Sequence, residues 1–236
     1  MRYGGMERKQ SIRIQKSLTN AMEKRILVWL AERMPRWVTS DMLTCVGVVG
    51  AVTIAAGYVL TVYDYRWLWL ASVGFVINWF GDSLDGTLAR VRNQQRPYYG
   101  FFLDHNIDGI NESLMFVGIG LSPFVNFGLS MALLAVYLLL SIYVYISAHL
   151  KNEFKLTYAK LGPTEFRLLA ILVNTLMVCI EPLRTFTGTW SLLGREVRVG
   201  VLDYVAAVVL VVMIVMLVVS LVHDGREYAR MDPPKR

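Results

Sequence analysis

Four aspartates interrupt a stretch of the chain that is otherwise mostly apolar. Asp82 and Asp85 lie three positions apart, and Asp104 and Asp108 lie four positions apart, so each pair shares one face if its segment is helical. A carboxylate at the centre of a membrane helix costs about 2.5–3.5 kcal/mol, and groups kept at that cost are expected to bind something cationic. Divalent metal ions prefer such oxygen ligands. The spacing therefore predicts two helices whose acidic faces meet around metal.

Small residues accompany the acids on both predicted faces. Gly86 and Ala89 share the face of the first pair, while Gly100 begins the stripe of the second pair and Glu112 continues it. Missing side chains let a nucleotide approach the backbone. Metal ions between converging carboxylates relieve their repulsion and hold substrate phosphates. One alternative stays open, in which the acids pair with three nearby arginines, Arg90, Arg92 and Arg96.

The elements that carry these residues are predicted to be membrane helices. Of the 236 residues, 55% are hydrophobic, and the mean hydropathy is +0.45, as is typical of a multi-span membrane protein. A span needs about 20 mostly apolar residues. Six segments are candidates, at about residues 42–63, 67–90, 101–121, 124–150, 166–180 and 201–222. The second and third are the least apolar, because they contain the aspartates.

Charge predicts which side of the membrane each loop occupies. Lys and Arg collect in cytoplasmic loops, and all but four of the 24 fall on the side of the two chain ends and of the loops at 90–100 and 150–167. Both ends and the aspartates are therefore expected at the cytoplasmic face of a membrane, which we take to be a bacterial inner membrane. The net charge of +6 then reflects topology and attraction to anionic lipid, and it gives no argument for nucleic acid.

The predicted fold is an all-α integral membrane protein, with six transmembrane helices preceded by an N-terminal interfacial amphipathic helix. Residues 1–39 are expected to form a cytoplasmic segment that contains this helix at about 17–34. Residues 40–223 hold the six spans, and 224–236 form a cytoplasmic tail. The segment at 182–200 is expected to be a loop on the far side of the membrane.

The acids and their small neighbours together resemble the signature of the CDP-alcohol phosphotransferase family, which is written D-x2-D-G-x2-A-R-x8-G-x3-D-x3-D. All eight fixed positions match, although nine residues rather than eight separate Arg90 from Gly100. The signature covers 27 residues, and the expected interfacial helix and six spans extend the resemblance over nearly the whole chain. Ser40 to Thr44 also resembles the PNxLT start of the first span in relatives, with Pro and Asn replaced.

The resemblance implies an enzyme of phospholipid biosynthesis that binds a CDP-linked lipid donor, a polar alcohol acceptor and two divalent ions, Mg²⁺ or Mn²⁺. The acceptor hydroxyl attacks the phosphorus next to the donor alcohol, and CMP leaves. Carried over by position, the metal ligands are Asp82, Asp85, Asp104 and Asp108. Asp108 also serves as general base, with Asp104 and His105 as the other catalytic residues. The nucleotide contacts are Gly86, Ala89, Arg90 and Gly100. Relatives commonly dimerise, so a homodimer is a further expectation.

The acceptor is expected to be water-soluble, with CDP-diacylglycerol as the donor. Residues before and at the start of the fifth span could hold an acceptor that carries phosphate, such as inositol phosphate or glycerol phosphate, or could serve only as cytoplasmic charge. These candidate contacts are Lys151, Lys160, Glu165 and Arg167. The Asp104–His105 pair also resembles the choline and ethanolamine phosphotransferase branch, in which diacylglycerol is the acceptor. His105 could assist the base or form a local bond.

Two other classes of protein place acidic residues in membrane helices. A membrane prenyltransferase holds Mg-diphosphate between two aspartate motifs, but it has more spans and lacks the element that joins Asp85-Gly86 to Ala89-Arg90. A divalent-cation transporter commonly shows repeated halves or interrupted helices, and this sequence shows no repeat. Both stay as alternatives, to be separated from a CDP-dependent transferase by their chemistry.

Overall fold

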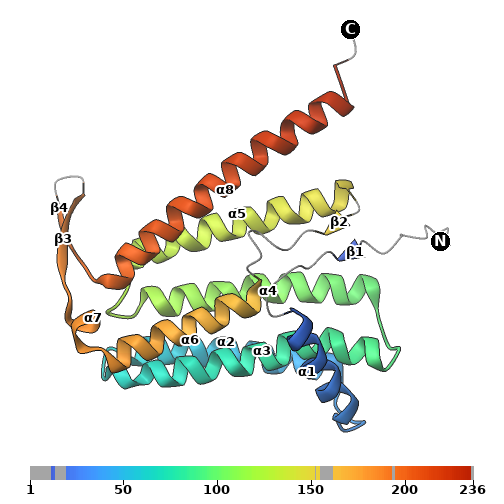
Figure 1. Cartoon of the computed structure of the whole chain (residues 1–236), viewed down its shortest axis with the longest axis horizontal. Coiled ribbons are helices and arrows are strands. Elements are labelled where there is room, and N and C mark those ends of the chain that lie inside the picture. The colour runs from blue at the N-terminus through green and yellow to red at the C-terminus, as the bar shows by residue number, and fades with distance from the viewer. Residues whose placement is uncertain (1–11, 14–19, 152, 155–161, 193–194, 235–236) are drawn as a thin grey trace.

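The long apolar runs of the chain form helices that lie side by side (Figure 1). The structure is a computed structural model, which describes residues 12–13, 20–151, 153–154, 162–192 and 195–234. Its helices are α1 (Asn20–Arg33), α2 (Ser40–Leu60), η1 (Tyr65–Trp67), α3 (Leu68–Val91), α4 (Pro97–Gly120), α5 (Phe127–Lys151), α6 (Pro163–Cys179), α7 (Glu181–Thr185) and α8 (Val201–Met231). Its strands are β1 (Ile12–Arg13), β2 (Glu153–Phe154), β3 (Gly188–Leu192) and β4 (Arg195–Val199).

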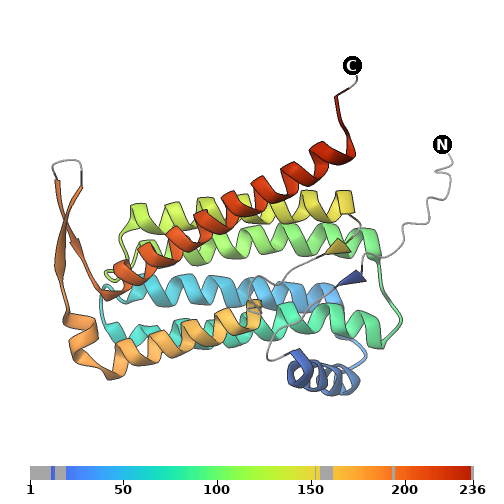
Figure 2. The ribbon, with the colours of Figure 1, turned by 45° about the horizontal axis from the view of Figure 1, so that its top comes forward.

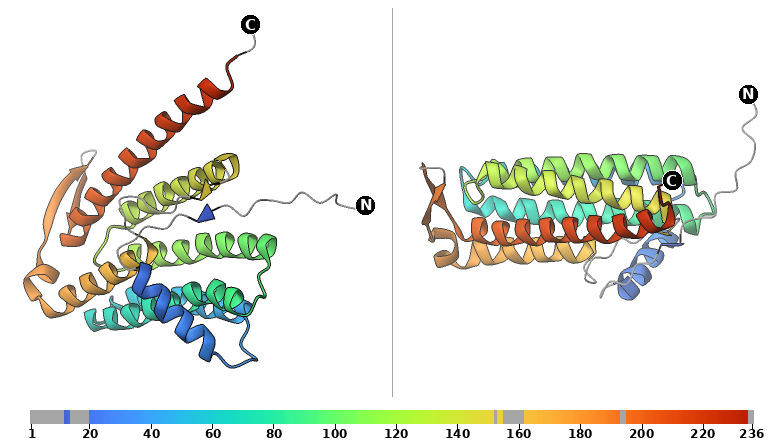
Figure 3. Two further views of the ribbon diagram at one scale, coloured as in Figure 1. Left: turned by 45° about the vertical axis from the view of Figure 1, so that its right-hand side comes forward. Right: turned by 90° about the horizontal axis from the view of Figure 1, so that it is seen from above.

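Short connections join α2 to α3, α3 to α4 and α4 to α5, so these helices run in alternating directions and the bundle has two distinct ends (Figures 1 and 2). One end holds the start of α2, the end of α3 and the start of α4, and α1 lies across it. The other end holds η1, α7 and the hairpin of β3 and β4. All four motif aspartates therefore belong to the end covered by α1. Toward its C-terminus, α8 leans away from the rest of the bundle (Figure 3).

Three described helices are long and apolar enough to cross a membrane, at Ser40–Leu60, Phe127–Ser147 and Val201–Met231. They correspond to the first, fourth and sixth predicted spans. The predicted second span does form one continuous helix, α3, and α4 has the same length of 24 residues. Their acidic residues lower their hydropathy, and α6 has only 17 residues. Length and composition of the described helices thus support three of the six predicted spans, and the other three stay a prediction.

Helices α2 and α3 approach each other unusually closely, and glycines make that approach possible. A Cβ added at Gly50 would lie within 3.0 Å of the backbone of Asn78, and one at Gly81 would lie equally close to Gly47 and the Leu43 carbonyl. Small residues that let helix backbones meet are a common basis for helix association in membranes. The contact places α3, with its aspartates, directly against the start of α2.

Helix α1 packs one apolar face onto the same pair of helices. Leu27 and Ala31 are buried against Leu84 and Leu88 of α3, while a second apolar group is exposed on α1, namely Met22, Ile26 and Trp29. The described structure thus has a helix within the predicted 17–34 range, whereas its placement at a membrane interface stays a prediction.

The prediction of a loop at 182–200 is wrong. Glu181–Thr185 form α7, and β3 pairs with β4 in an antiparallel hairpin in which Trp190 lies opposite Val197. Aromatic and β-branched residues of this kind favour strands, a signal that the glycines of the segment obscured. In addition, α8 continues to Met231, past the predicted end of the sixth span.

The close α2–α3 contact makes Gly81 sensitive to substitution. We expect Gly81→Ala to lower the free energy of unfolding by about 1–3 kcal/mol, because the new methyl group must push the two backbones apart. Thermal unfolding in detergent, followed by tryptophan fluorescence, measures the change. Gly225→Ala on α8 is the control, since a Cβ there meets nothing within 4 Å, and it should be neutral or stabilising by up to about 1 kcal/mol. Equal melting temperatures for the two variants would contradict the packing argument.

Candidate active site

The acidic residues of α3 and α4 come together as a compact cluster. One carboxylate oxygen from each of Asp82, Asp104 and Asp108 lies within 4.8 Å of the other two. Asp82 is in the last turns of α3 and the other two are in the first half of α4. All three side chains are partly buried. The spacing of four residues places Asp104 and Asp108 on one face of α4, toward Asp82.

Asp85 belongs to the same helix face but has a different environment. Its Oδ2 accepts a hydrogen bond of 2.7 Å from Thr44 Oγ1, and its Oδ1 accepts one from the N–H of Gly86. Ser40 Oγ donates to the Asp85 carbonyl at 2.9 Å. The start of α2 therefore holds Asp85 in place, and repulsion from Asp82 and Asp104 reaches it as well. It lies at the edge of the cluster rather than within it.

The cluster receives a positive charge from α6. Arg167 forms an ion pair with Asp82 across 2.5 Å, and its side chain is only 13% exposed. Its Nε donates to Asn78 Oδ1 at 2.9 Å, and Asn78 in turn donates to the Gly47 carbonyl at 2.9 Å. The same guanidinium offsets the charges of Asp108 and Glu112. Arg167 is thus the counterion of Asp82 within the cluster.

The arginines near the motif have other partners. Arg92 donates to the carbonyls of Met34, Pro35 and Val38. Arg96 pairs with Asp41 at 3.7 Å and lies over a tyrosine ring. The alternative in which the aspartates pair with the arginines of the 90–100 loop therefore has no support from the bonds that Arg92 and Arg96 form.

The predicted nucleotide contacts border the cluster. Arg90 donates to Thr87 Oγ1 at 2.9 Å, and a Cβ at Gly86 would lie 3.4 Å from the Arg90 guanidinium. A Cβ at Gly100 would meet nothing within 4 Å, so open space adjoins the first turn of α4. Ala89 follows on the same face of α3. The open space at Gly100 is compatible with a ligand there, and the nucleotide contacts stay a prediction.

The His105 ring contacts its own helix and Tyr145 of α5. Its Nδ1 lies 2.8 Å from the Phe101 carbonyl oxygen, the two rings stack with centroids 4.0 Å apart, and Tyr145 packs against the imidazole edge. Its Nδ1 is 3.8 Å from Asp104 Oδ2, which is beyond hydrogen-bonding distance. A neutral ring that donates through Nδ1 keeps its lone pair on Nε2.

Of the residues proposed for the acceptor, Arg167 is the one that the described structure places at the cluster. Glu165 accepts the N–H of Gly162 at 2.9 Å and so caps the start of α6. Lys151 ends α5, but its side chain lies outside the described residues, as does all of Lys160.

Sequence reasoning missed two residues that support the site. Asn78 is fully buried in an apolar stretch of α3, and a lone amide in such a stretch is itself a signal, because buried polar groups need partners. Thr44 falls in the segment that resembles the start of the first span in relatives, but nothing in the sequence connects it to Asp85. The contact of Thr44 with Asp85 joins residues 41 positions apart, and that of Asn78 with Arg167 joins residues 89 positions apart.

The donor set fits one or more small divalent ions. Carboxylate oxygens within 4.8 Å of one another can converge on Mg²⁺ or Mn²⁺ with little adjustment, since metal–oxygen distances are about 2.0–2.1 Å for Mg²⁺. An ion would also relieve the repulsion among the carboxylates. A second group on α8, His223, Asp224 and Glu227, has similar spacing, but Tyr143 donates to Asp224 at 2.7 Å.

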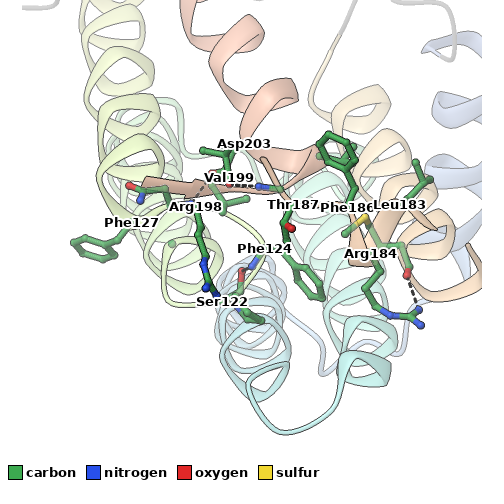
Figure 4. A pocket seen from close by; sticks show the side chains of 17 residues that line it. Ser122, Phe124, Phe127, Leu183, Arg184, Phe186, Thr187, Arg198, Val199 and Asp203 are labelled. Atoms are coloured by element: carbon green, nitrogen blue, oxygen red, sulfur yellow. Dashed lines mark hydrogen bonds between the residues drawn. The ribbon is translucent and has the colours of Figure 1, made fainter. Parts of the chain in front are cut away.

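A separate cavity of about 380 Å³ lies at the hairpin end of the bundle (Figure 4). Arg184 lines it and donates to the Met177 and Val178 carbonyls, so this arginine caps α6. Asp203 lines it too and accepts the N–H groups of Asn126 and Gly200. This cavity is at the opposite end from the aspartates and is not part of their site.

Comparison with known proteins identifies relatives of this chain. Residues 37–219 match the profile of the CDP-alcohol phosphatidyltransferase family. A phosphatidylinositol phosphate synthase of Cutibacterium acnes is 34% identical over 84 residues, which cover 36% of this chain and 38% of the relative. Cholinephosphotransferase 1 of Xenopus laevis is 31% identical over 106 residues, which cover 42% of this chain and 26% of the relative. The chain thus spans well under half the length of each of these relatives.

Arg167 and a divalent ion should compete for Asp82. We therefore expect Arg167→Gln to tighten Mn²⁺ binding by about tenfold, which corresponds to about 1.4 kcal/mol. The substitution removes a positive charge that competes with the ion for Asp82. Electron paramagnetic resonance of free Mn²⁺ in detergent without substrates measures the affinity. Arg96→Gln is the control, because that arginine pairs with exposed Asp41 instead. An unchanged Mn²⁺ affinity in Arg167→Gln would contradict this account.

Proposed function

Because this chain belongs to the CDP-alcohol phosphatidyltransferase family, we propose that it transfers a substituted phosphate from CDP-diacylglycerol to the hydroxyl of a polar alcohol and releases CMP. The observation that carries the proposal is the cluster of Asp82, Asp104 and Asp108 between α3 and α4. These three aspartates are also positions of the family signature. The reaction belongs to phospholipid biosynthesis, and the family consists of transferases of this kind.

The aspartates are proposed to hold the metal. Asp82, Asp104 and Asp108 supply oxygens from two helices, and Asp85 contributes from the edge that Thr44 orients. Two bound Mg²⁺ or Mn²⁺ ions would neutralise the diphosphate and polarise the phosphorus under attack. The protein's own part is to present the carboxylates in a fixed geometry, which the close α2–α3 contact provides.

Asp108 is the proposed general base, with Asp104 beside it. As the acceptor oxygen forms its bond to the phosphorus next to diacylglycerol, Asp108 takes the hydroxyl proton, and the bond from that phosphorus to the CMP oxygen breaks. The two substrates are both anionic, so positioning and charge neutralisation account for much of the catalysis. His105, which bonds to the Phe101 carbonyl, is proposed to hold the first turns of α4 rather than to move a proton.

The nucleotide is proposed to lie over Gly86, Ala89 and Arg90, with Gly100 across from them. Arg90 is held by Thr87 at the end of α3 and can reach a phosphate of the donor. The open space next to Gly100 gives room for the cytidine.

The acceptor is proposed to carry phosphate, as inositol phosphate or glycerol phosphate does. Arg167 supports this, because a guanidinium next to the metal ligands can bind a phosphate while the ions replace it at Asp82. A bacterial relative named phosphatidylinositol phosphate synthase points the same way. The second candidate is a choline or ethanolamine phosphotransferase that uses diacylglycerol, which the Asp104–His105 pair and the relative named cholinephosphotransferase favour.

The proposed membrane arrangement has six spans within residues 40–223. Helices α3 and α4 have 24 residues each, or about 36 Å, which exceeds the roughly 30 Å of the hydrocarbon core. The acids then lie toward the end where most Lys and Arg gather, proposed as cytoplasmic. Arg66, Arg184 and Arg198 are at the other end. Residues 1–39 and 224–236 are proposed to remain on the cytoplasmic side.

Release of CMP tests the reaction. We expect purified protein in detergent with Mg²⁺ and CDP-diacylglycerol to release CMP with one member of a panel of inositol phosphate, inositol, glycerol phosphate and serine. Chelation of the metal should abolish release. If no member of the panel supports release but CDP-choline with diacylglycerol does, the second candidate is correct. Intact protein that releases CMP under neither condition would refute the proposed function.

Asp108→Asn tests the proposed base. We expect kcat to fall by about 10²–10⁴-fold, the range typical of a lost general base, while binding of the CDP donor changes little. Steady-state CMP release and donor binding by filter assay measure the two effects. Asp41→Asn is the control, an exposed acid at the same end that pairs with Arg96, and it should keep normal turnover.

A further inference from the structure

Glu23 of α1 connects two helices of the site. Its Oε1 accepts a hydrogen bond of 2.9 Å from Trp79 Nε1 on α3 and one of 2.6 Å from Thr164 Oγ1 on α6. These partners are 56 and 141 residues away in the chain. One carboxylate oxygen therefore bridges three helices at a partly buried position.

The packing of α1 explains why Glu23 can reach both partners. Leu27 and Ala31 follow at successive intervals of four residues, so they share one helix face with Glu23. Both are buried against α3 and the start of α2. This anchored face brings Glu23 within hydrogen-bonding distance of Trp79 on α3 and Thr164 in the first turn of α6.

Both partners of Glu23 lie close in sequence to Arg167 or to a residue that binds it. Trp79 directly follows Asn78, to which Arg167 donates. Thr164 is three residues before Arg167, which is one turn of α6. Contacts from Glu23 to Trp79 and Thr164 thus brace the same helix turns that carry the bonds from Arg167 to Asn78 and Asp82.

We propose that Glu23 is a positioning residue for Arg167: by tying the start of α6 to α3, it holds the guanidinium at the acidic cluster. The part of this inference that concerns the acceptor rests on the proposed function, whereas the part that concerns the metal does not. Loss of the bridge frees the first turn of α6, Arg167 spends less time at Asp82, and both ion binding and acceptor binding change.

The chemistry of the bridge allows a matched set of variants. Glu23→Gln retains an oxygen that can accept both bonds, so it should behave like the unmodified protein, whereas Glu23→Ala removes the acceptor. Thr164→Val removes one donor with little change of shape. Glu32→Ala, an exposed glutamate on the same helix, controls for loss of a charge from α1.

The first measurement is Mn²⁺ affinity without substrates. Glu23→Ala and Thr164→Val should tighten Mn²⁺ binding by threefold or more, in the same direction as Arg167→Gln, and combining Glu23→Ala with Arg167→Gln should give no tightening beyond Arg167→Gln alone. Glu23→Gln and Glu32→Ala should leave the affinity within twofold. If Glu23→Ala does not fold, Thr164→Val carries the same test. An unchanged Mn²⁺ affinity in the folded variants, or full additivity with Arg167→Gln, would overturn the proposal.

The second measurement is kinetic and separates positioning from general damage. Glu23→Ala and Thr164→Val should raise the KM for the phosphorylated acceptor about tenfold, while the KM for CDP-diacylglycerol and kcat stay within about twofold. A rise in both KM values with a fall in kcat, together with a lower melting temperature, would show a merely structural role. If Arg167→Gln leaves the acceptor KM unchanged, the acceptor role of Arg167 in the proposed function fails, and the Mn²⁺ series still decides the role of Glu23.

Discussion

Negative charge inside an apolar helix bundle is the constraint on which the rest of this structure depends. Three carboxylates approach within 4.8 Å, and such a group is unfavourable unless cations offset it. Arg167 provides part of that compensation from α6, and Asn78 holds the arginine from the middle of α3. In the proposed function, a bound metal ion would replace Arg167 as the positive partner of Asp82.

Helix packing makes this concentration of charge possible. The glycine contacts between α2 and α3 bring the Asn78 amide within reach of the Gly47 carbonyl and Thr44 within reach of Asp85. A larger side chain at Gly50 or Gly81 would separate the helices and break those bonds together. Small residues on α2 and α3 thus set the geometry at the acids.

Local periodicity and hydropathy could be read from the sequence, but long-range pairing could not. Helical spacing placed Asp82 with Asp85 and Asp104 with Asp108, and apolar length identified α2, α5 and α8. The bond from Arg167 to Asp82 joins residues 85 positions apart, and that from Thr164 to Glu23 spans 141. Such contacts depend on how helices pack, which no local pattern encodes. The hairpin of β3 and β4 was missed because its glycines suggested a loop.

The pairing of α2 with α3 also bears on how the chain enters a lipid bilayer. By length and composition α2 can partition into the bilayer by itself, whereas α3 is not among the described helices that can. Each carboxylate in α3 would oppose insertion of that helix as an isolated segment. Since the glycine-lined contact forms between consecutive helices joined by a short turn, α2 and α3 are suited to leave the insertion machinery as a preassembled hairpin. Biogenesis of the protein would then depend on the same contact that shapes its acids.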